Sequence, residues 1–122
     1  MQLYEKYIYK IIQDRDLDVN PITLKRYYHY LVKNLRLPCV VKHTEGNYFD
    51  FTDYGKDTPD ASLSFELLEV VDEVQDYSNL FCKVRPVGSE KVYEFQLFEF
   101  ETADAHNGPI LELSSMWIDE NL

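Results

Sequence analysis

The spacing of the apolar residues changes at Leu37-Pro38, from the 3.6-residue period of a helix to the two-residue period of a strand. Proline ends the helical part because it disfavours helical backbone in the residue before it and has no N–H to donate. Directly after it, Cys39 and Val41 alternate with Val40 and Lys42. The chain is therefore expected to be an α+β protein, with helices first and strands after.

Two helices are predicted before the proline. The first ends near Gln13, and its apolar residues recur three and four apart: Tyr4, Tyr7, Ile8, Ile11 and Ile12. In the second, Asn20 can cap the helix and Pro21 can occupy its first turn. The apolar face of this helix consists of Leu24, Tyr27, Tyr28, Leu31 and Leu35.

Several β-rich runs follow, and the chain then returns to helical spacing. The predicted strands lie near 39–42, 65–71, 80–85 and 91–97, with a further short candidate at 48–51. Pro86–Glu90 reads as a hairpin loop, after which Tyr93, Phe95 and Leu97 face a core. Ile110–Trp117 has helical spacing again. We expect one domain over 1–122, made of a helical part (1–36), a β part (37–100) and a C-terminal helical segment (101–122).

Composition favours a folded, cytoplasmic protein. Of the 122 residues, 45% are hydrophobic and 15% aromatic, which excludes a disordered acidic tail. No apolar run approaches the roughly 18 residues of a membrane span, and Met1–Lys6 lacks the pattern of a secretion signal. Cys39 and Cys82 read as small apolar side chains in a reducing compartment.

Charge divides the chain into two unequal parts. Residues 1–44 carry eight Lys/Arg and four Asp/Glu, whereas 45–76 carry ten carboxylates against the single base Lys56, and the whole chain has net charge −10. Such an acidic part repels phosphate backbones and anionic lipid, which disfavours direct nucleic-acid binding or membrane docking through it. It attracts hard cations or basic protein surfaces.

The first candidate metal site is the long acidic loop before the second predicted strand. Carboxylates recur there every three or four residues, together with Thr52 and Gly55. Calcium takes six to eight oxygen ligands in flexible geometry, which such a loop can supply. The candidate ligands are Asp50, Asp53, Asp57 and Asp60.

A second acidic cluster follows Glu66 at the end of the same apolar strand. Carboxylates this close repel one another unless they are neutralised, and a bound divalent cation would remove that cost. A solvated surface screened by salt explains the same residues equally well. The candidate ligands here are Glu69, Asp72, Glu73 and Asp76.

Asp14, Asp16 and Asp18 match the first three ligands of an EF-hand loop. That template also requires glycine at position 6 and a bidentate glutamate at position 12. This chain has Val19 and Lys25 there. The segment is therefore interpreted as a solvated turn between two helices rather than an EF-hand.

Catalytic patterns are missing from the sequence. Cys39 and His43 are four apart on a predicted strand, which separates them by about 13 Å and prevents a thiolate–imidazole pair. The sequence has no zinc-type CxxC, no glycine-rich phosphate loop, and no GxSxG or HExxH motif. The chain is not expected to be an enzyme.

One family is suggested by three stretches of the chain: Arg26–Val41, Gln96–Glu99 and Leu113–Trp117. An aromatic-rich helix end leads through Asn-Leu and proline into a strand, a later strand enters an acidic turn, and a tryptophan lies near the C-terminus. Together they resemble the bacterial calcium-binding proteins of the cyanobacterial CcbP type, over most of residues 20–118. The resemblance implies an SH3-like antiparallel β-barrel after two helices, closed by a C-terminal helical turn, and Ca²⁺ bound by surface acidic residues without an EF-hand.

Two functions are consistent with these observations. The first is a cytosolic Ca²⁺ buffer or sensor that uses acidic surface sites. The alternative is an acidic interaction protein, such as a DNA mimic, inhibitor or immunity-like protein, that docks on a basic protein partner. Oligomeric state and physiological process are not indicated by any residue pattern.

Overall fold

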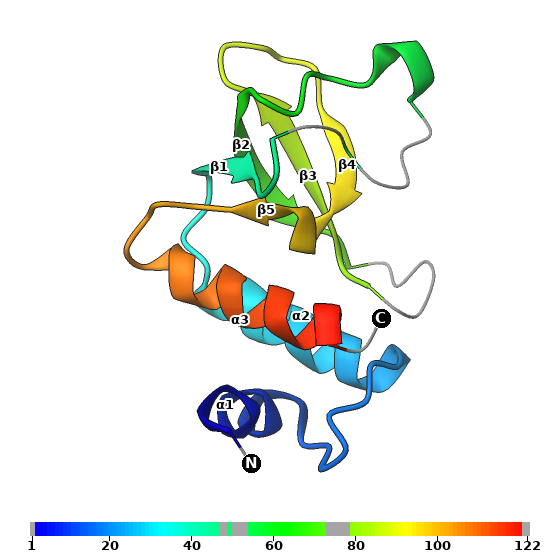
Figure 1. Cartoon of the computed structure of the whole chain (residues 1–122), viewed down its shortest axis with the longest axis vertical. Helices are drawn as coiled ribbons and strands as arrows, with labels where there is room; N and C mark the ends of the chain where they lie inside the picture. Colours follow the sequence, from blue (N-terminus) through cyan, green and yellow to red (C-terminus); the bar gives the residue numbers. More distant parts are fainter. Residues whose placement is uncertain (1, 47–48, 50–53, 73–78, 121–122) are drawn as a thin grey trace.

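The computed structural model describes residues 2–46, 49, 54–72 and 79–120. In these residues the order of helices and strands is α1, α2, β1, β2, β3, β4, β5 and α3. A β-sheet forms one side of the molecule, α2 and α3 pack beside it, and α1 lies on the far side of these two helices (Figure 1). None of the helices in the described ranges is long and apolar enough to cross a membrane.

The two N-terminal helices begin and end where their capping residues predict. Helix α1 spans Leu3–Ile12 and ends at Gln13, whose backbone is left-handed with φ 57°. Helix α2 spans Pro21–Asn34. Its cap Asn20 accepts hydrogen bonds from the N–H groups of Ile22 and Thr23, both at 3.0 Å, and so satisfies two donors that have no partner inside the helix.

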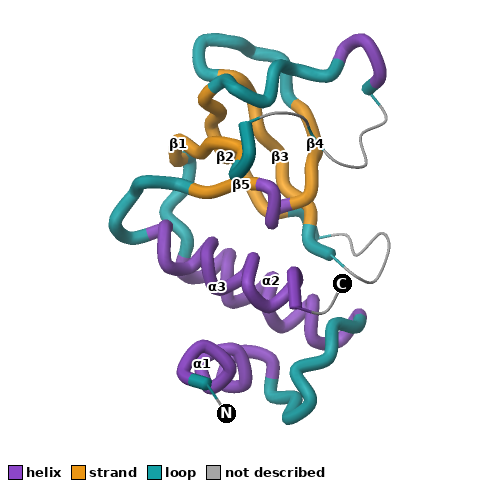
Figure 2. The backbone as a smooth tube through the Cα atoms, viewed as in Figure 1, coloured by secondary structure: helices purple, strands orange, loops and turns teal. Residues whose placement is uncertain are grey.

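The sheet has five antiparallel strands in the order β4-β3-β2-β1-β5 (Figure 2). The strands are β1 Cys39–His43, β2 Ser64–Val70, β3 Phe81–Pro86, β4 Tyr93–Gln96 and β5 Phe100–Glu101. The predicted α+β class is confirmed, and the four longer strands lie where the two-residue period placed them. The two-residue β5 was not predicted, because two residues are too few to show a period.

The sheet is open, which differs from the closed barrel expected from the resemblance. Its outer strands β4 and β5 are not neighbours in the ladder of the described residues. A short 3₁₀ turn, η2 (Leu97–Glu99), connects them and carries the chain from one edge of the sheet to the other. Strand β5 pairs with β1 at Lys42 and His43, and no ladder joins β5 to β4 in the described part of the chain.

The core includes side chains of the three helices and of the sheet, and aromatic rings are prominent in the part beside the sheet. Tyr93, Phe95 and Leu97 are buried as predicted, and the ring of Phe49 stacks on that of Phe95 with 3.9 Å between centroids. Gln96 was expected on the wet face, yet it is also buried, because the chain turns into η2 directly after it.

The C-terminal segment forms a full helix, α3 (Asn107–Glu120), rather than a single helical turn. Its first residue joins it to the end of α2. Arg36 N donates to Asn107 Oδ1 at 2.9 Å, and Asn107 Nδ2 donates to Arg36 O at 2.8 Å. Further along, Trp117 stacks on Tyr27 of α2 with 5.0 Å between ring centroids, so the two helices run side by side.

Candidate metal site

Three carboxylates meet in the turn between α1 and α2. One oxygen each of Asp14, Asp16 and Asp18 can be chosen so that all lie within 4.8 Å of one another. Asp16 and Asp18 are exposed and Asp14 is partly buried. Among the described residues, these three aspartates form the group of metal-ligating side chains whose oxygen atoms lie close enough together to hold one ion.

The turn has a defined backbone conformation. Asp14 Oδ1 accepts a hydrogen bond from Asp16 N at 3.1 Å, and Asp14 O accepts one from Leu17 N at 3.1 Å. Leu17 adopts a left-handed conformation with φ 56°, and its side chain packs against the core. The apolar residue of the turn therefore points inward while Asp16 and Asp18 remain in solvent.

Hydrogen bonds from two helices hold the turn in place. From α2, Arg26 donates to Ile12 O at 2.7 Å and Thr23 Oγ1 donates to Asp18 O at 2.7 Å. From α3, the indole Nε1 of Trp117 donates to Leu17 O at 2.8 Å. The three carboxylates are thus presented on a backbone that the folded helices fix.

The chemistry of this group suits a hard cation. Three carboxylate oxygens at a solvated turn leave room for carbonyl and water ligands, which calcium accepts in numbers of six to eight. The EF-hand template still fails, because Lys25 lies within α2 and its ammonium is ion-paired with Asp72. The prediction of a solvated interhelical turn agrees with the structure, but the sequence did not indicate how closely the carboxylates approach one another.

The predicted loop site is described only in part. Asp57 is exposed in the short turn η1 (Gly55–Asp57). Asp60 Oδ1 accepts hydrogen bonds from Ser62 N at 2.9 Å and from Ser62 Oγ at 2.7 Å, and these two bonds hold the pKa of Asp60 below its usual value. Asp50 and Asp53 lie outside the described residues. This loop site therefore stays a prediction.

In the second predicted cluster, basic side chains lie beside the described carboxylates. Glu69 pairs with Lys83 at 3.2 Å, and Asp72 pairs with Lys25. Glu66 pairs with Arg85, also at 3.2 Å. Glu73 and Asp76 lie outside the described residues. Two lysines thus supply at Glu69 and Asp72 the neutralisation for which a metal ion was predicted.

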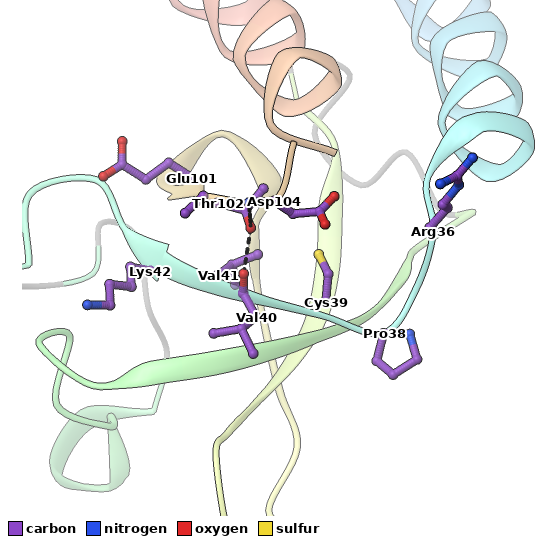
Figure 3. A pocket seen from close by; sticks show the side chains of 10 residues that line it. Arg36, Pro38, Cys39, Val40, Val41, Lys42, Glu101, Thr102 and Asp104 are labelled. Carbon is purple, nitrogen blue, oxygen red and sulfur yellow. Dashed lines mark hydrogen bonds between the residues drawn. The ribbon is translucent and has the colours of Figure 1, made fainter. Parts of the chain in front are cut away.

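A cavity of about 730 Å³ lies beside β1, and Figure 3 shows the side chains that line it. Thr102 Oγ1 donates to Val40 O across it at 2.6 Å. Cys39 also lines this cavity, and burial raises the pKa of its thiol, as does the charge of Asp104, against an opposing hydrogen bond with Asn107. A protonated thiol is a poor nucleophile, so the cavity offers no activated group.

Comparisons with known proteins find similarity in fold. No protein-family model and no curated protein sequence matches the chain. A solved structure described as a calcium binding protein in the calcium-binding form superposes with a TM-score of 0.68 at 17% identity, covering 96% of this chain and 90% of that one. The crystal structure of Anabaena CcbP gives a TM-score of 0.68 at 16% identity, covering 97% and 91%. The predicted similarity to a CcbP-type fold is confirmed, with an open sheet in place of the expected closed barrel.

Proposed function

We propose that this chain binds Ca²⁺ and that the Asp14, Asp16 and Asp18 turn is one of its sites. The observation that carries the proposal is the approach of the three carboxylate oxygens to within 4.8 Å on an anchored turn. The similarity in fold to two solved proteins, one of them described as calcium-binding, supports it. A cytosolic role as buffer or sensor follows from the acidic composition and from the bacterial family that the sequence resembles.

Calcium is the preferred ion at such a site. Magnesium requires near-ideal octahedral geometry at 2.0–2.1 Å and gives up its water reluctantly, whereas calcium tolerates irregular sets of oxygen ligands. The carboxylates belong to a turn whose Asp16 and Asp18 are exposed, so bulk water can complete the coordination of the larger ion. We expect low-to-moderate affinity, because this turn provides three of the six to eight ligands.

Isothermal titration with Ca²⁺, repeated with Mg²⁺ and in 150 mM salt, tests the function. At that ionic strength the Debye length is about 8 Å, so condensed counterions are screened while coordinated ions remain. Saturable binding that prefers Ca²⁺ and persists in salt supports the proposal. Weak heats that do not distinguish the two ions contradict it.

The location of the site requires matched variants. Asp16→Asn with Asp18→Asn removes two charges, and Glu90→Gln with Glu112→Gln removes two at exposed positions elsewhere. We expect the first pair to weaken Ca²⁺ binding at least tenfold and the second to change it less than twofold, because coordination depends on the ligands and not on net charge. Equal effects would point to a general electrostatic attraction.

Trp117 supplies a second readout of the same site. It is the single tryptophan of the chain, and its indole N–H donates to the carbonyl of Leu17, between two of the three aspartates. An ion bound at the turn should change this hydrogen bond and hence the fluorescence. A Ca²⁺ titration that shows heat but leaves the fluorescence unchanged would favour the predicted acidic loop, which Asp57→Asn with Asp60→Asn then tests.

A basic protein partner is the alternative function, and the described contacts support it less. Glu66, Glu69 and Asp72 already pair with basic side chains of this chain. Their charge is therefore partly neutralised before any partner arrives. Failure of Ca²⁺ titration together with salt-sensitive capture of a basic protein would transfer the proposal to this alternative.

A further inference from the structure

His43, the last residue of β1, is buried against Glu99 of η2. The two side chains are 3% and 2% exposed, and His43 Nε2 lies 3.3 Å from Glu99 Oε1. The rings of Phe49 and Phe100 pack around the imidazole, with centroids 5.0 and 6.4 Å from its own. The pair is titratable and lies apart from the residues proposed above to bind calcium.

The second ring nitrogen determines where the proton is. The backbone N–H groups of Glu45 and Gly46 donate to His43 Nδ1 at 3.2 and 3.1 Å. A nitrogen that accepts hydrogen bonds carries no proton, so the single proton of the neutral ring is on Nε2, which donates it toward Glu99. Thr44 N also donates to the backbone carbonyl of Glu99, at 2.9 Å. The backbone N–H groups of residues 44, 45 and 46 thus all donate hydrogen bonds to His43 or Glu99.

We propose that His43 is a proton-operated latch on the backbone of Glu45 and Gly46. A second proton can only be added at Nδ1, which then becomes a donor. The N–H groups of Glu45 and Gly46 would face another N–H, so both hydrogen bonds are lost. The contact from Nε2 to Glu99 becomes a charge-assisted hydrogen bond at the same time and grows stronger. Protonation therefore releases the loop backbone while the ring stays docked on η2.

The groups around His43 bear on whether its ring takes up a second proton. Cys82 of β3 lies in the same region, where burial raises the pKa of its thiol and the charges of Glu99 and Glu94 raise it further, so the thiol stays neutral. At His43 itself, the adjacent carboxylate that can pair with an imidazolium is Glu99. Neighbouring charges on β1 and β5, Lys42 and Glu101, are exposed and screened by solvent. Burial of the ring and the two amide donors both oppose the second proton.

Nuclear magnetic resonance of the ¹⁵N-labelled wild-type chain, without calcium, tests the latch between pH 8 and pH 5. Histidine side chains generally titrate in this range, whereas carboxylates remain largely ionised. At pH 8 we expect the ring ¹⁵N shifts to show a proton on Nε2 and none on Nδ1. As Nδ1 gains its proton, the exchange protection factors of the Glu45 and Gly46 amides should fall about tenfold, the factor that corresponds to about one net hydrogen bond. Amides in the middle of β2 should keep their protection.

Three results would overturn the proposal: a proton on Nδ1 at pH 8, a ring that stays neutral down to pH 5, or a ring that titrates without loss of protection at residues 45 and 46.

The variant His43→Asn adds a matched comparison, because the asparagine oxygen can replace Nδ1 as acceptor and takes up no proton in this range. Its two amides should stay protected from pH 8 to pH 5. Protection that falls in this variant as it does in the wild type would show that His43 is not the latch. The wild-type measurement decides the question independently if the variant fails to fold.

Discussion

Replacing Trp117 with phenylalanine tests whether the C-terminal helix fixes the aspartate turn. Trp117 is 1% exposed, stacks on Tyr27 and donates a hydrogen bond to Leu17 O. Phenylalanine loses the hydrogen bond, worth about 1 kcal/mol, part of the aromatic stacking, worth about 1 kcal/mol, and part of the buried ring, worth about 1 kcal/mol. The free energy of unfolding should fall by about 3 kcal/mol, out of the 5 to 15 kcal/mol typical of a domain.

Urea unfolding followed by circular dichroism measures this loss, since the variant has no tryptophan to observe. For a chain of this length the same loss corresponds to a fall in melting temperature of about 10 °C. Met116→Ala is the matched control: it is the adjacent residue on α3 and is 36% exposed, so its loss should stay below about 1 kcal/mol. If Trp117→Phe is no more harmful than Met116→Ala, the indole does not stabilise the turn and the reasoning is wrong.

Three further predictions concern charge and thiol chemistry. The cross-strand ion pair between Glu66 and Arg85 is partly exposed. A double-mutant cycle with Glu66→Gln and Arg85→Met should therefore give a coupling energy of about 0.5 kcal/mol that shrinks in high salt. A coupling energy that is undiminished at 1 M salt would contradict this prediction. Because the pKa of Asp60 is lowered in the folded chain, its contribution to stability is present above the unfolded value near 4 and is lost as pH falls through the folded value. Asp60→Ala should therefore destabilise the chain more at pH 7 than in acid, which denaturant titration at both pH values checks. Cys82 is fully buried with a raised pKa, so a thiol reagent at pH 8 should modify Cys39 first and Cys82 only at the rate of unfolding; equal rates would show that Cys82 is accessible.

The parts of the fold that the sequence predicted are those set by neighbouring residues. Asn20 and Pro21 are adjacent to the helix they start, and the alternation from Tyr93 to Leu97 is visible within five residues. Strand β5 pairs Lys42 with Glu101, and the pattern of neither segment reveals that contact. The pairing of His43 with Glu99 spans 56 positions and escaped prediction for the same reason.

The aspartate turn shows what a sequence template leaves out. Its sequence fails the EF-hand template at two positions, and that failure is real. The closeness of its carboxylates depends instead on the left-handed backbone at Leu17 and on hydrogen bonds from Arg26, Thr23 and Trp117. The last of these residues is 100 positions away from Leu17, so a template confined to 12 consecutive residues cannot include it.

Regional net charge in the sequence differs from the charge that neighbouring side chains create in the fold. The bases that pair with Glu66, Glu69 and Asp72 all lie outside residues 45–76, at Arg85, Lys83 and Lys25. The register of β2 against β3 then places Arg85 opposite Glu66 and Lys83 opposite Glu69. Among the residues that the structure describes, the three-carboxylate cluster occurs in the part of the chain with net positive charge. A cation responds to charges within about one Debye length in space, roughly 8 to 10 Å. The charges that lie nearby in the fold therefore decide where a cation is attracted. For this reason, replacing Asp16 and Asp18 with asparagine is a sharper test than a change in total charge.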